Sequence, residues 1–329
     1  MKKRYVFITR SLPESVIEPL KQIAKVQMWP KEDEPVPQDV LIEEARKADA
    51  LITMISDKID DHLFAAAPNL QVIANLAVGY DNIDVAAATK RGIAVCNTPD
   101  VLTDTTADLT FGLLISTARR LMEAEAFVKE GKWKSWSPLL LAGHDIHHKT
   151  IGIVGMGKIG QAVAKRATGF EMKVYYHNRT RKLDAEKELD ATYCTFPELL
   201  ETADYVVCLT PSTPETKHLF DEKAFKKMKQ TAIFVNASRG DVVDEEALYE
   251  ALVNGEIAAA GLDVFKNEPI DEKHPFLSLS NVVALPHIGS ASIETRTKMM
   301  NLCCHNIISI LSNERPKTIV NKEWLHTNC

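Results

Sequence analysis

Three ionisable side chains lie just beyond short apolar runs in the second half of the chain. They are Arg239 in "VNASRGDVVDEEAL", Glu268 in "GLDVFKNEP" and His287 in "VVALPHIGSAS". A guanidinium fork matches a carboxylate bidentately, and an imidazole can move a proton near neutral pH. A neighbouring carboxylate favours the charged imidazole. These residue types could therefore grip an organic acid and protonate its reacting centre.

A glycine-rich turn precedes these residues. "GMGKIG" places Gly155, Gly157 and Gly160 in G-x-G-x-x-G spacing, between an apolar run and the helical "QAVAKRA". The glycines permit the turn, the approach of the backbone to a pyrophosphate, and close packing of the helix. The helix N-terminus, at Lys158 and Ile159, would stabilise the negative charge. The motif predicts a dinucleotide site, and the alternative is a tight turn without a ligand.

The segment "HNRTR", residues 177–181, bears on the choice of coenzyme. An acidic residue usually stands about 20 residues after the glycine turn and binds the ribose 2′-OH of NAD. Here Asn178 stands 18 residues after Gly160, followed by Arg179 and Thr180. A guanidinium and a hydroxyl suit a 2′-phosphate. The segment predicts a preference for NADP(H) over NAD(H), unless Arg179 is merely a solvated surface charge.

The elements that must position these residues alternate along the whole chain. Short β-branched runs such as "RYVFITR", "ADALITMI" and "GIAVCNTP" are separated by helical stretches, and six further strands follow Thr150. This alternation predicts an α/β fold with two doubly wound parallel-sheet domains. In such sheets the strand carboxyl ends face the ligand, so Arg239, Glu268 and His287 could converge beside a nicotinamide. A final helix is expected over about 292–312.

A long helix is predicted from about 103 to 131. Its apolar residues lie on nearly all sides, so it must be covered on several faces, between domains or between subunits. The irregular stretch "KWKSWSPLLLAGHDIHHKT" follows, and it is either a core-covering loop or a subunit contact. Its histidines lack carboxylate or cysteine partners at ligand spacing. No metal site is therefore expected.

Composition restricts the class of protein. The 329 residues carry a net charge of −6 at a pI of about 6.0, which gives no reason to expect binding to nucleic acid. None of the six cysteines forms a C-x-x-C pair, which fits a reducing compartment. The chain shows neither a signal peptide nor a stretch long enough to span a membrane. A cytoplasmic protein is expected.

Several long segments, in order, resemble the D-isomer-specific 2-hydroxyacid dehydrogenase family, and within it the glyoxylate/hydroxypyruvate reductases. The resemblance covers "NLAVGYDNID", "TADLTFGLLI", the glycine turn and the three segments that contain Arg239, Glu268 and His287. It implies a Rossmann coenzyme domain, at 100–290, inserted into a flavodoxin-like substrate domain formed by 1–99 plus 291–329. It also implies an NADPH-preferring reductase that converts glyoxylate to glycolate and hydroxypyruvate to D-glycerate.

The resemblance assigns a role to each residue of the site. Arg239 would bind the substrate carboxylate, and His287, assisted by Glu268, would protonate the forming alkoxide. The backbone amides of Val78 and Gly79 would also hold the substrate. Further coenzyme contacts are expected from a set that includes a helical threonine, a turn serine and an aspartate near the nicotinamide: Thr106, Ser238, Asp263 and Gly289. Ser238 could reach the 2′-phosphate end or merely cap its turn, and a homodimer is expected.

Two alternatives remain from the sequence. The same machinery could reduce a longer 2-keto acid such as 2-ketogluconate, because pocket size cannot be read from the residues. A non-enzymatic scaffold that senses NAD(H) is the alternative from another class, since relatives of this fold serve as transcriptional corepressors.

Overall fold

The computed structural model describes residues 3–328, so Cys329 and the first two residues lie outside the described part. Within it the chain forms two compact units. Unit 1 comprises the chain up to Leu102 and again from Ser292, and unit 2 comprises Thr103–Ala291. Each unit is built on one parallel sheet, which confirms the predicted α/β fold class.

The sheet of unit 1 has five strands in the order β2-β1-β3-β4-β5, which is the flavodoxin-like order. Strands β3, β4 and β5 are buried throughout, as expected where helices cover both faces of a parallel sheet. The strands are β1 (Arg4–Ile8), β2 (Ala24–Met28), β3 (Ala50–Thr53), β4 (Val72–Asn75) and β5 (Ala94–Cys96).

The edge strand β2 is absent from the elements predicted by sequence. It follows α1 (Glu14–Ile23) directly, with no turn residue between helix and strand. Exposure alternates along β2, with Lys25 and Gln27 on the more exposed face of the sheet.

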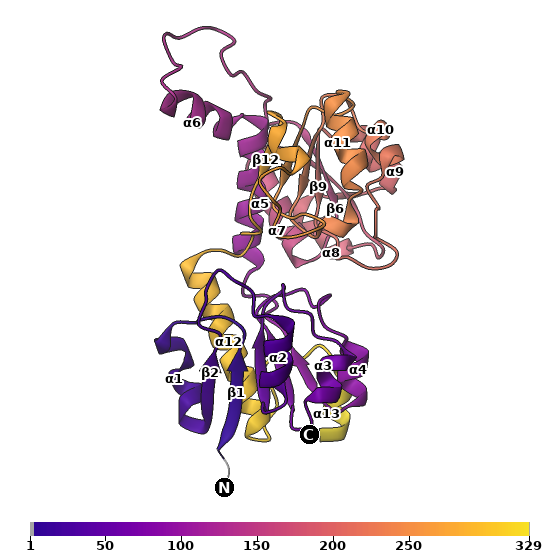
Figure 1. Ribbon diagram of the computed structural model, residues 1–329. Coiled ribbons are helices and arrows are strands. Elements are labelled where there is room, and N and C mark those ends of the chain that lie inside the picture. The colour runs from indigo at the N-terminus through magenta and orange to yellow at the C-terminus, as the bar shows by residue number, and fades with distance from the viewer. Residues whose placement is uncertain (1–2, 329) are drawn as a thin grey trace. The chain divides into compact units, whose positions relative to one another are not determined.

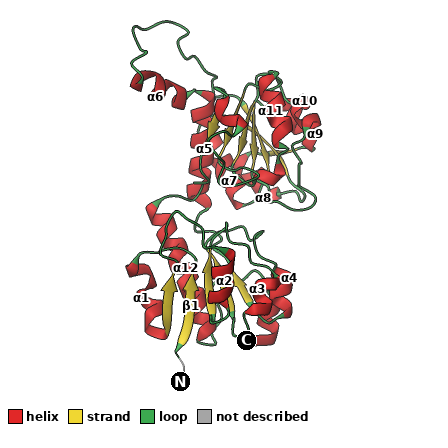
Figure 2. Cartoon of the chain, viewed as in Figure 1, coloured by secondary structure: helices red, strands yellow, loops and turns green. Residues whose placement is uncertain are grey.

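Helices lie on both faces of this sheet (Figures 1 and 2). Helix α12 packs against α1 and against β3, β4 and β5 on one face, and its observed start and end agree with the predicted final helix. The opposite face is covered by α2, α3 and α4, which share one apolar cluster with the strands. The bounds are α2 (Gln38–Ala45), α3 (Asp61–Ala66), α4 (Val85–Lys90), α12 (Ile293–Leu311) and α13 (Glu323–Asn328).

The C-terminal segment is attached to unit 1 by buried hydrogen bonds. Asn321 accepts from the backbone N–H of Val95 at 2.8 Å and donates to the carbonyl of Ile93 at 2.9 Å. The indole of Trp324 donates to the carbonyl of Gly92 at 2.8 Å. These bonds fasten the C-terminal segment to unit 1 beside β5.

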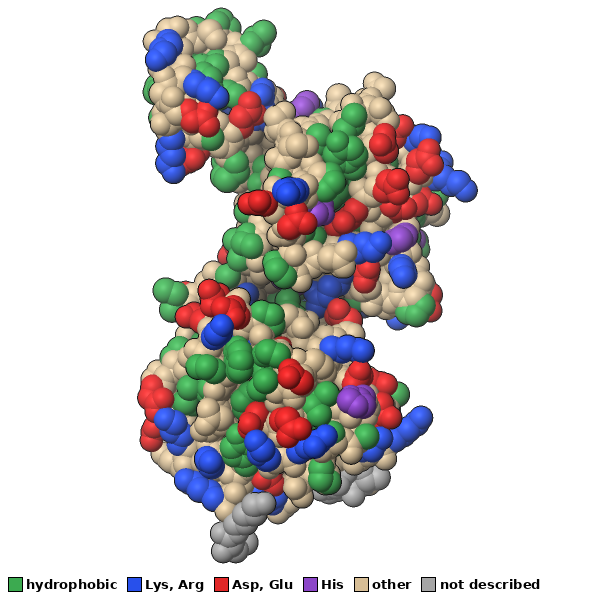
Figure 3. All heavy atoms as spheres, in the orientation of Figure 1, with side chains coloured by type: hydrophobic (Ala, Val, Ile, Leu, Met, Phe, Trp, Pro, Cys, Tyr) green, Lys and Arg blue, Asp and Glu red, His purple; other side chains and the backbone are tan. Residues whose placement is uncertain are grey.

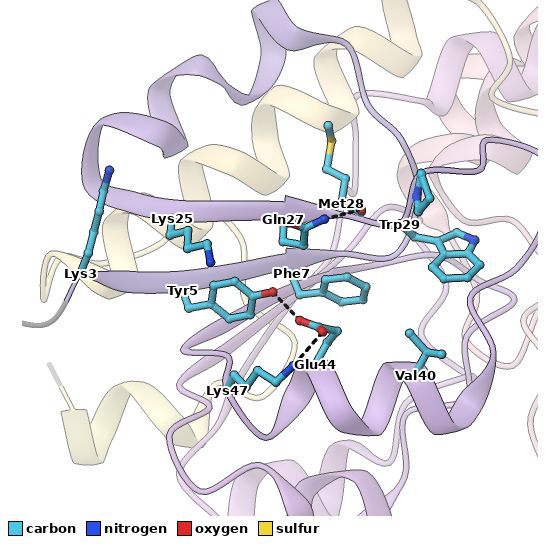
Figure 4. A pocket seen from close by; sticks show the side chains of 11 residues that line it. Lys3, Tyr5, Phe7, Lys25, Gln27, Met28, Trp29, Val40, Glu44 and Lys47 are labelled. Carbon is cyan, nitrogen blue, oxygen red and sulfur yellow. Dashed lines mark hydrogen bonds and ion pairs between the residues drawn. The ribbon is translucent and has the colours of Figure 1, made fainter.

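A groove of about 810 Å³ runs along unit 1 beside α2 (Figure 4). Tyr5 and Phe7 of β1 line it, and Lys25 lies 5.6 Å from the centre of the Tyr5 ring. At its centre the Glu44 carboxylate accepts from the Tyr5 hydroxyl and, at 2.9 Å, from Lys47. The carboxylate of Glu44 thus already has hydrogen-bond donors within unit 1.

The sheet of unit 2 has seven strands in the order β12-β11-β10-β9-β6-β7-β8. Counted from β6, this is the order of a dinucleotide-binding sheet, in which the strand sequence reverses between β6 and β9. The two-residue β8 adds one strand to the six predicted. The strands are β6 (Thr150–Val154), β7 (Lys173–His177), β8 (Thr192–Tyr193), β9 (Tyr205–Cys208), β10 (Ile233–Asn236), β11 (Ala259–Leu262) and β12 (Val282–Ala284).

Two apolar clusters pack on the opposite faces of this sheet. One joins the strands to α5, α7 and α8, and the other joins them to α9, α10 and α11. The bounds are α7 (Lys158–Thr168), α8 (Leu183–Leu189), α9 (Phe196–Thr202), α10 (Glu222–Lys227) and α11 (Glu245–Val253).

The prediction of one helix over about 103–131 is wrong. The chain forms α5 (Thr103–Ala118) and α6 (Leu121–Lys129), with a left-handed φ of 53° at Arg120 between them. The returning loop donates from His144 N–H to the Ala118 carbonyl at 2.9 Å. Because that carbonyl is the one the next helical turn would need, α5 ends there.

The apolar faces of α5 are covered inside unit 2. Helix α5 packs against α7 and against strands β10, β11 and β12. At Gly261 of β11 an added Cβ would lie 2.6 Å from Thr117 Oγ1 and 2.8 Å from Leu113 Cγ. The absence of a side chain at Gly261 therefore lets the helix approach the sheet closely.

Helix α6 and the loop that follows extend away from the sheet of unit 2 (Figure 1). Helix α6 contains no buried residue. Trp136 in the loop is 77% exposed and Leu139 is 83% exposed, and the chain is buried again at Ile146. This arm, residues 121–145, displays large apolar side chains to solvent.

The surface carries both signs of charge. On the face shown in Figure 3, acidic and basic side chains are interspersed over both units. Among residues 3–328, no helix combines the length and the apolar character that a membrane crossing requires.

Candidate active site

The glycine turn between β6 and α7 has the geometry of a dinucleotide cradle. Gly155 has a φ of +104°, and a Cβ there would lie 2.6 Å from the backbone of Leu209. A Cβ at Gly160 would lie 2.2 Å from the Gly155 carbonyl oxygen. At Gly157, however, a Cβ would meet no described atom within 4 Å. The first and third glycines serve the fold, while the second borders open space.

That open space lies in front of the start of α7. Gly157 is the N-cap residue and provides no side-chain cap. Lys158 and Ile159, both predicted coenzyme contacts, are the first residues of the helix. Backbone N–H groups at a helix start have no acceptor within the helix and attract anions. The residues present therefore fit the pyrophosphate of a dinucleotide.

The turn after β7 separates the two arginines of "HNRTR". Asn178 Nδ2 donates to the carbonyl of Thr180 at 2.7 Å and closes the turn, whereas Arg179 is exposed. Arg181 instead donates twice to Glu186 of α8, with both distances 2.7 Å. These hydrogen bonds are the main cause that lowers the pKa of Glu186 to about 2. Arg181 is thus paired with Glu186 of α8, whereas Arg179 is the arginine of this segment that could bind an anion in front of the turn.

A carboxylate near Arg179 escapes sequence reasoning. A hydrogen bond to Thr213 is the main cause that lowers the pKa of Glu215, and the positive charge of Arg179 lowers it further. Glu215 lies in the loop after β9, and nothing in its sequence spacing from Arg179 indicates that the two charges interact. An anion bound at Arg179 would therefore also experience the field of Glu215.

Three predicted coenzyme residues, Thr106, Asp263 and Gly289, meet beyond the carboxyl ends of β11 and β12. An added Cβ at Gly289 would lie 3.3 Å from Asp263 Oδ2 and 3.3 Å from Thr106 Cγ2. The buried Asp263 carboxylate accepts from the N–H groups of Ile288 and Gly289, both at 2.8 Å. Burial is the main cause of its raised pKa, although these hydrogen bonds act in the opposite direction. In the described structure Asp263 anchors the turn after β12.

The same turn presents His287. Its φ is 53°, and its N–H donates to the carbonyl of Asp263 at 2.9 Å. The ring Nδ1 lies 2.7 Å from Glu268 Oε2, and Glu268 Oε1 accepts from the N–H of Phe265 at 2.8 Å. Residues separated by nearly 20 positions are thereby joined in a chain of hydrogen bonds.

Charge reinforces this arrangement. Burial acts to raise the pKa of Glu268, but the hydrogen bond and charge of His287 outweigh it, and the pKa is lowered overall. The charge of Arg239 also contributes to the lowering. The described structure therefore pairs Glu268 with His287, and the charge of Arg239 acts on the same carboxylate.

Arg239 lies in a tight turn after β10. Asn236, whose role sequence reasoning missed, donates to the Arg239 carbonyl at 3.0 Å and accepts from the Ser238 N–H at 3.0 Å. The Ser238 hydroxyl also donates to Asn236, at 2.8 Å, so it caps the turn. These hydrogen bonds fit the turn-capping alternative for Ser238; its turn follows β10, three strands from β7.

Val78 and Gly79 lie in unit 1, in the loop after β4. Their carbonyl oxygens accept from the side-chain amides of Asn97, at 2.8 Å, and Asn75, at 2.9 Å. These hydrogen bonds fix the loop at the carboxyl end of the sheet, the edge where doubly wound folds bind ligands.

Taken together, the strand order, the cradle and the acid–base pair define a dinucleotide-binding fold equipped for proton transfer. The profile of "D-isomer specific 2-hydroxyacid dehydrogenase, NAD binding domain" matches residues 111–289. Glyoxylate reductase from Thermococcus gammatolerans is 52% identical over 325 residues, covering 98% of this chain and 97% of the relative. Glyoxylate reductase from Pyrococcus furiosus is 50% identical over 325 residues, covering 98% and 96%.

Solved structures agree over nearly the whole chain. A protein from Thermus thermophilus superposes with a TM-score of 0.90 at 42% identity, covering 96% of this chain and 99% of that one. An NADPH-dependent glyoxylate/hydroxypyruvate reductase from Sinorhizobium meliloti, in complex with NADP and malonate, has a TM-score of 0.85 at 33% identity, with 98% of each chain covered.

The chain belongs to the D-isomer specific 2-hydroxyacid dehydrogenase family and is an NAD(P)-dependent enzyme of that family. The resemblance seen in the sequence is thereby confirmed.

We expect Glu268→Gln to lower kcat about 100-fold, because His287 loses the carboxylate that holds its Nδ1 at 2.7 Å and orients the ring. The exposed Glu272→Gln, in the same loop, is the matched control and should retain wild-type turnover. Steady-state kinetics measure both variants. Equal kcat values for Glu268→Gln and the wild type would contradict a role for the carboxylate charge.

The same substitution should alter acid stability in a defined sense. Because the pKa of Glu268 is lowered in the folded protein, its ionisation stabilises the fold above the unfolded value of 4.5. That contribution is lost as the pH falls through the lowered folded value. Thermal unfolding curves of wild type and Glu268→Gln should therefore differ more at neutral pH than at the acid end.

Proposed function

We propose that this enzyme reduces glyoxylate to glycolate and hydroxypyruvate to D-glycerate, with NADPH preferred over NADH. The observation that carries the substrate assignment is about 50% identity, over 98% of the chain, to glyoxylate reductases such as that of Thermococcus gammatolerans. The Sinorhizobium meliloti relative, which is NADPH-dependent and acts on both acids by its description, supports the second substrate.

The chain's own residues suit the two tasks that reduction of a 2-oxo acid requires. The Arg239 guanidinium would bind the substrate carboxylate through two parallel hydrogen bonds. Because Nδ1 of His287 faces Glu268 at 2.7 Å, Nε2 is the nitrogen left to protonate the forming alkoxide. The bound coenzyme supplies the hydride to the carbonyl carbon.

We assign substrate binding to unit 1 and coenzyme binding to unit 2. The glycine cradle lies wholly within unit 2, and the loop of Val78 and Gly79 lies in unit 1. In this assignment the backbone amides of that loop are the substrate contacts that unit 1 provides. The predicted domain limits, 1–99 plus 291–329 for the substrate domain and 100–290 for the coenzyme domain, correspond to this assignment.

The kinetic test is a panel of glyoxylate, hydroxypyruvate, 2-ketogluconate and pyruvate with NADPH. We expect the highest kcat/KM with glyoxylate, and His287→Ala should remove most of that turnover while coenzyme binding persists. A preference for 2-ketogluconate would replace the substrate assignment. No turnover with any of the four acids would instead favour a scaffold that senses the coenzyme.

The preference for NADPH rests on Arg179. Unit charges about 4 Å apart near a protein surface interact by roughly 4 kcal/mol before further screening. We therefore expect Arg179→Asp to shift the ratio of kcat/KM for NADPH over NADH at least about tenfold toward NADH. Lys182→Asp, an equal change of charge three residues away, is the control. An unchanged ratio in Arg179→Asp would refute the role of Arg179.

We also propose that the enzyme is a homodimer formed through the arm of residues 121–145. Large exposed apolar side chains such as Trp136 and Leu139 favour a protein contact, and apolar aromatic anchors are typical of stable interfaces. In sedimentation experiments the wild type should be a dimer, and the double variant Trp136→Lys with Leu139→Lys a monomer. A dimer that survives in the variant would place the interface elsewhere.

A further inference from the structure

The segment that carries Glu268 has little regular structure of its own. Between β11 and the short 3₁₀ turn at Pro275–Ser278, the chain runs through residues 263–274 as bends and turns. Glu268 makes one local hydrogen bond, from the Phe265 N–H. Something outside this segment must therefore hold the carboxylate opposite His287, because an unsupported loop would not keep a 2.7 Å contact.

Glu245, the first residue of α11, contacts both ends of the segment. Its Oε1 accepts from the Lys266 N–H at 2.7 Å, and its Oε2 lies 3.7 Å from His274 Nε2. One side chain thus spans the start and the end of the 266–274 loop. Both partners are largely enclosed, with side-chain exposures of 21% for Glu245 and 19% for His274, so the contact is mostly shielded from solvent.

The ring of His274 is fixed by aromatic neighbours. It lies edge-on to Phe265, with ring centroids 5.6 Å apart, and 5.2 Å from the ring of Phe276. Its Nδ1 is buried without a hydrogen-bond partner in the described part of the chain. The orientation of the ring therefore depends on the two phenylalanines and on Glu245.

Phe265 connects the ring of His274 to Glu268 and to the turn of Arg239. Its N–H donates to Glu268, and its backbone lies against Gly240, where an added Cβ would be 1.9 Å from the Phe265 carbonyl carbon. Gly240 follows Arg239 directly. Phe265, which directly precedes the 266–274 loop, is therefore packed against the turn of Arg239 and hydrogen-bonded to Glu268 within that loop.

We propose that Glu245 and His274 are positioning residues, which clamp the 266–274 loop and set the Glu268 carboxylate against His287. Neither touches the reacting atoms. The clamp deepens the proposed function, because its effect on turnover rests on the role proposed for His287.

The direct test observes the hydrogen bond itself. In protein labelled with ¹⁵N-histidine, the Nδ1–H proton of His287 should give a low-field NMR resonance, identified by its loss in His287→Ala. In Glu245→Ala this resonance should broaden or move upfield, because the carboxylate of Glu268 is no longer held in place. Glu246→Gln, on the exposed side of the same helical turn, is the control and should leave it unchanged.

Kinetics give the second readout. We expect kcat to fall about tenfold in Glu245→Ala, with the Kd for NADPH and the Tm close to wild type. Glu245→Gln keeps an oxygen for Lys266 N–H but loses the charge facing His274, and should fall about threefold. His274→Phe keeps the aromatic packing and should match Glu245→Gln. Agreement between these two variants separates the Glu245–His274 contact from the ring contacts, even if Glu245→Ala folds poorly.

The outcomes distinguish the two proposals. An unchanged resonance and unchanged kcat in Glu245→Gln and His274→Phe would overturn the clamp. Wild-type turnover in His287→Ala would overturn the proposed function instead. His287→Ala could keep wild-type turnover while Glu245→Ala still broadened or moved the Nδ1–H resonance of His287. In that case the clamp would position Glu268, but this positioning would not affect catalysis.

Discussion

The geometry of the site depends on the way Asp263 fastens the turn after β12 to the end of β11. Its carbonyl and both carboxylate oxygens accept three successive backbone N–H groups, from His287, Ile288 and Gly289. A left-handed residue is costly for most side chains, and these hydrogen bonds hold His287 in that conformation. Without these hydrogen bonds the imidazole of His287 would not face the carboxylate of Glu268, which, like Asp263, follows β11.

A parallel sheet explains why the residues of the site lie close together. Strand carboxyl ends meet at one edge, so β10, β11 and β12 deliver Arg239, Glu268 and His287 from three separate turns to neighbouring positions. The glycine cradle after β6 opens on the same edge. Glycine is required at Gly155 and Gly160 by the protein's own backbone, whereas the open space beside Gly157 is where a ligand fits.

Much of this arrangement could be predicted because it rests on local signals. Buried strands of β-branched residues, a glycine spacing and charged residues just beyond strand ends are visible in the residues themselves. The edge strand β2 was missed because no turn residue separates it from α1. The break between α5 and α6 was missed because His144, 26 residues further along the chain, donates to the Ala118 carbonyl, and neither glycine nor proline marks the site.

The site shows the same limit. Arg239, Glu268 and His287 have residue types that indicate their chemistry. Glu245, by contrast, contacts Lys266 and His274, which lie far from it in the sequence. Likewise, the influence of Arg179 on Glu215 depends on how the loops after β7 and β9 meet. Side-chain partners across such distances are set by packing and not by spacing.

The division of unit 1 into two sequence segments has a consequence for synthesis on the ribosome. Unit 2 is continuous and can close its core once Ala291 has emerged, since domains generally fold as units during translation. The first sheet, by contrast, must wait for α12 to cover one face and for Asn321 to bond beside β5. Until the last residues appear, the nascent chain exposes an apolar face that begins near its N-terminus, and this is the stage at which a chaperone has a surface to bind.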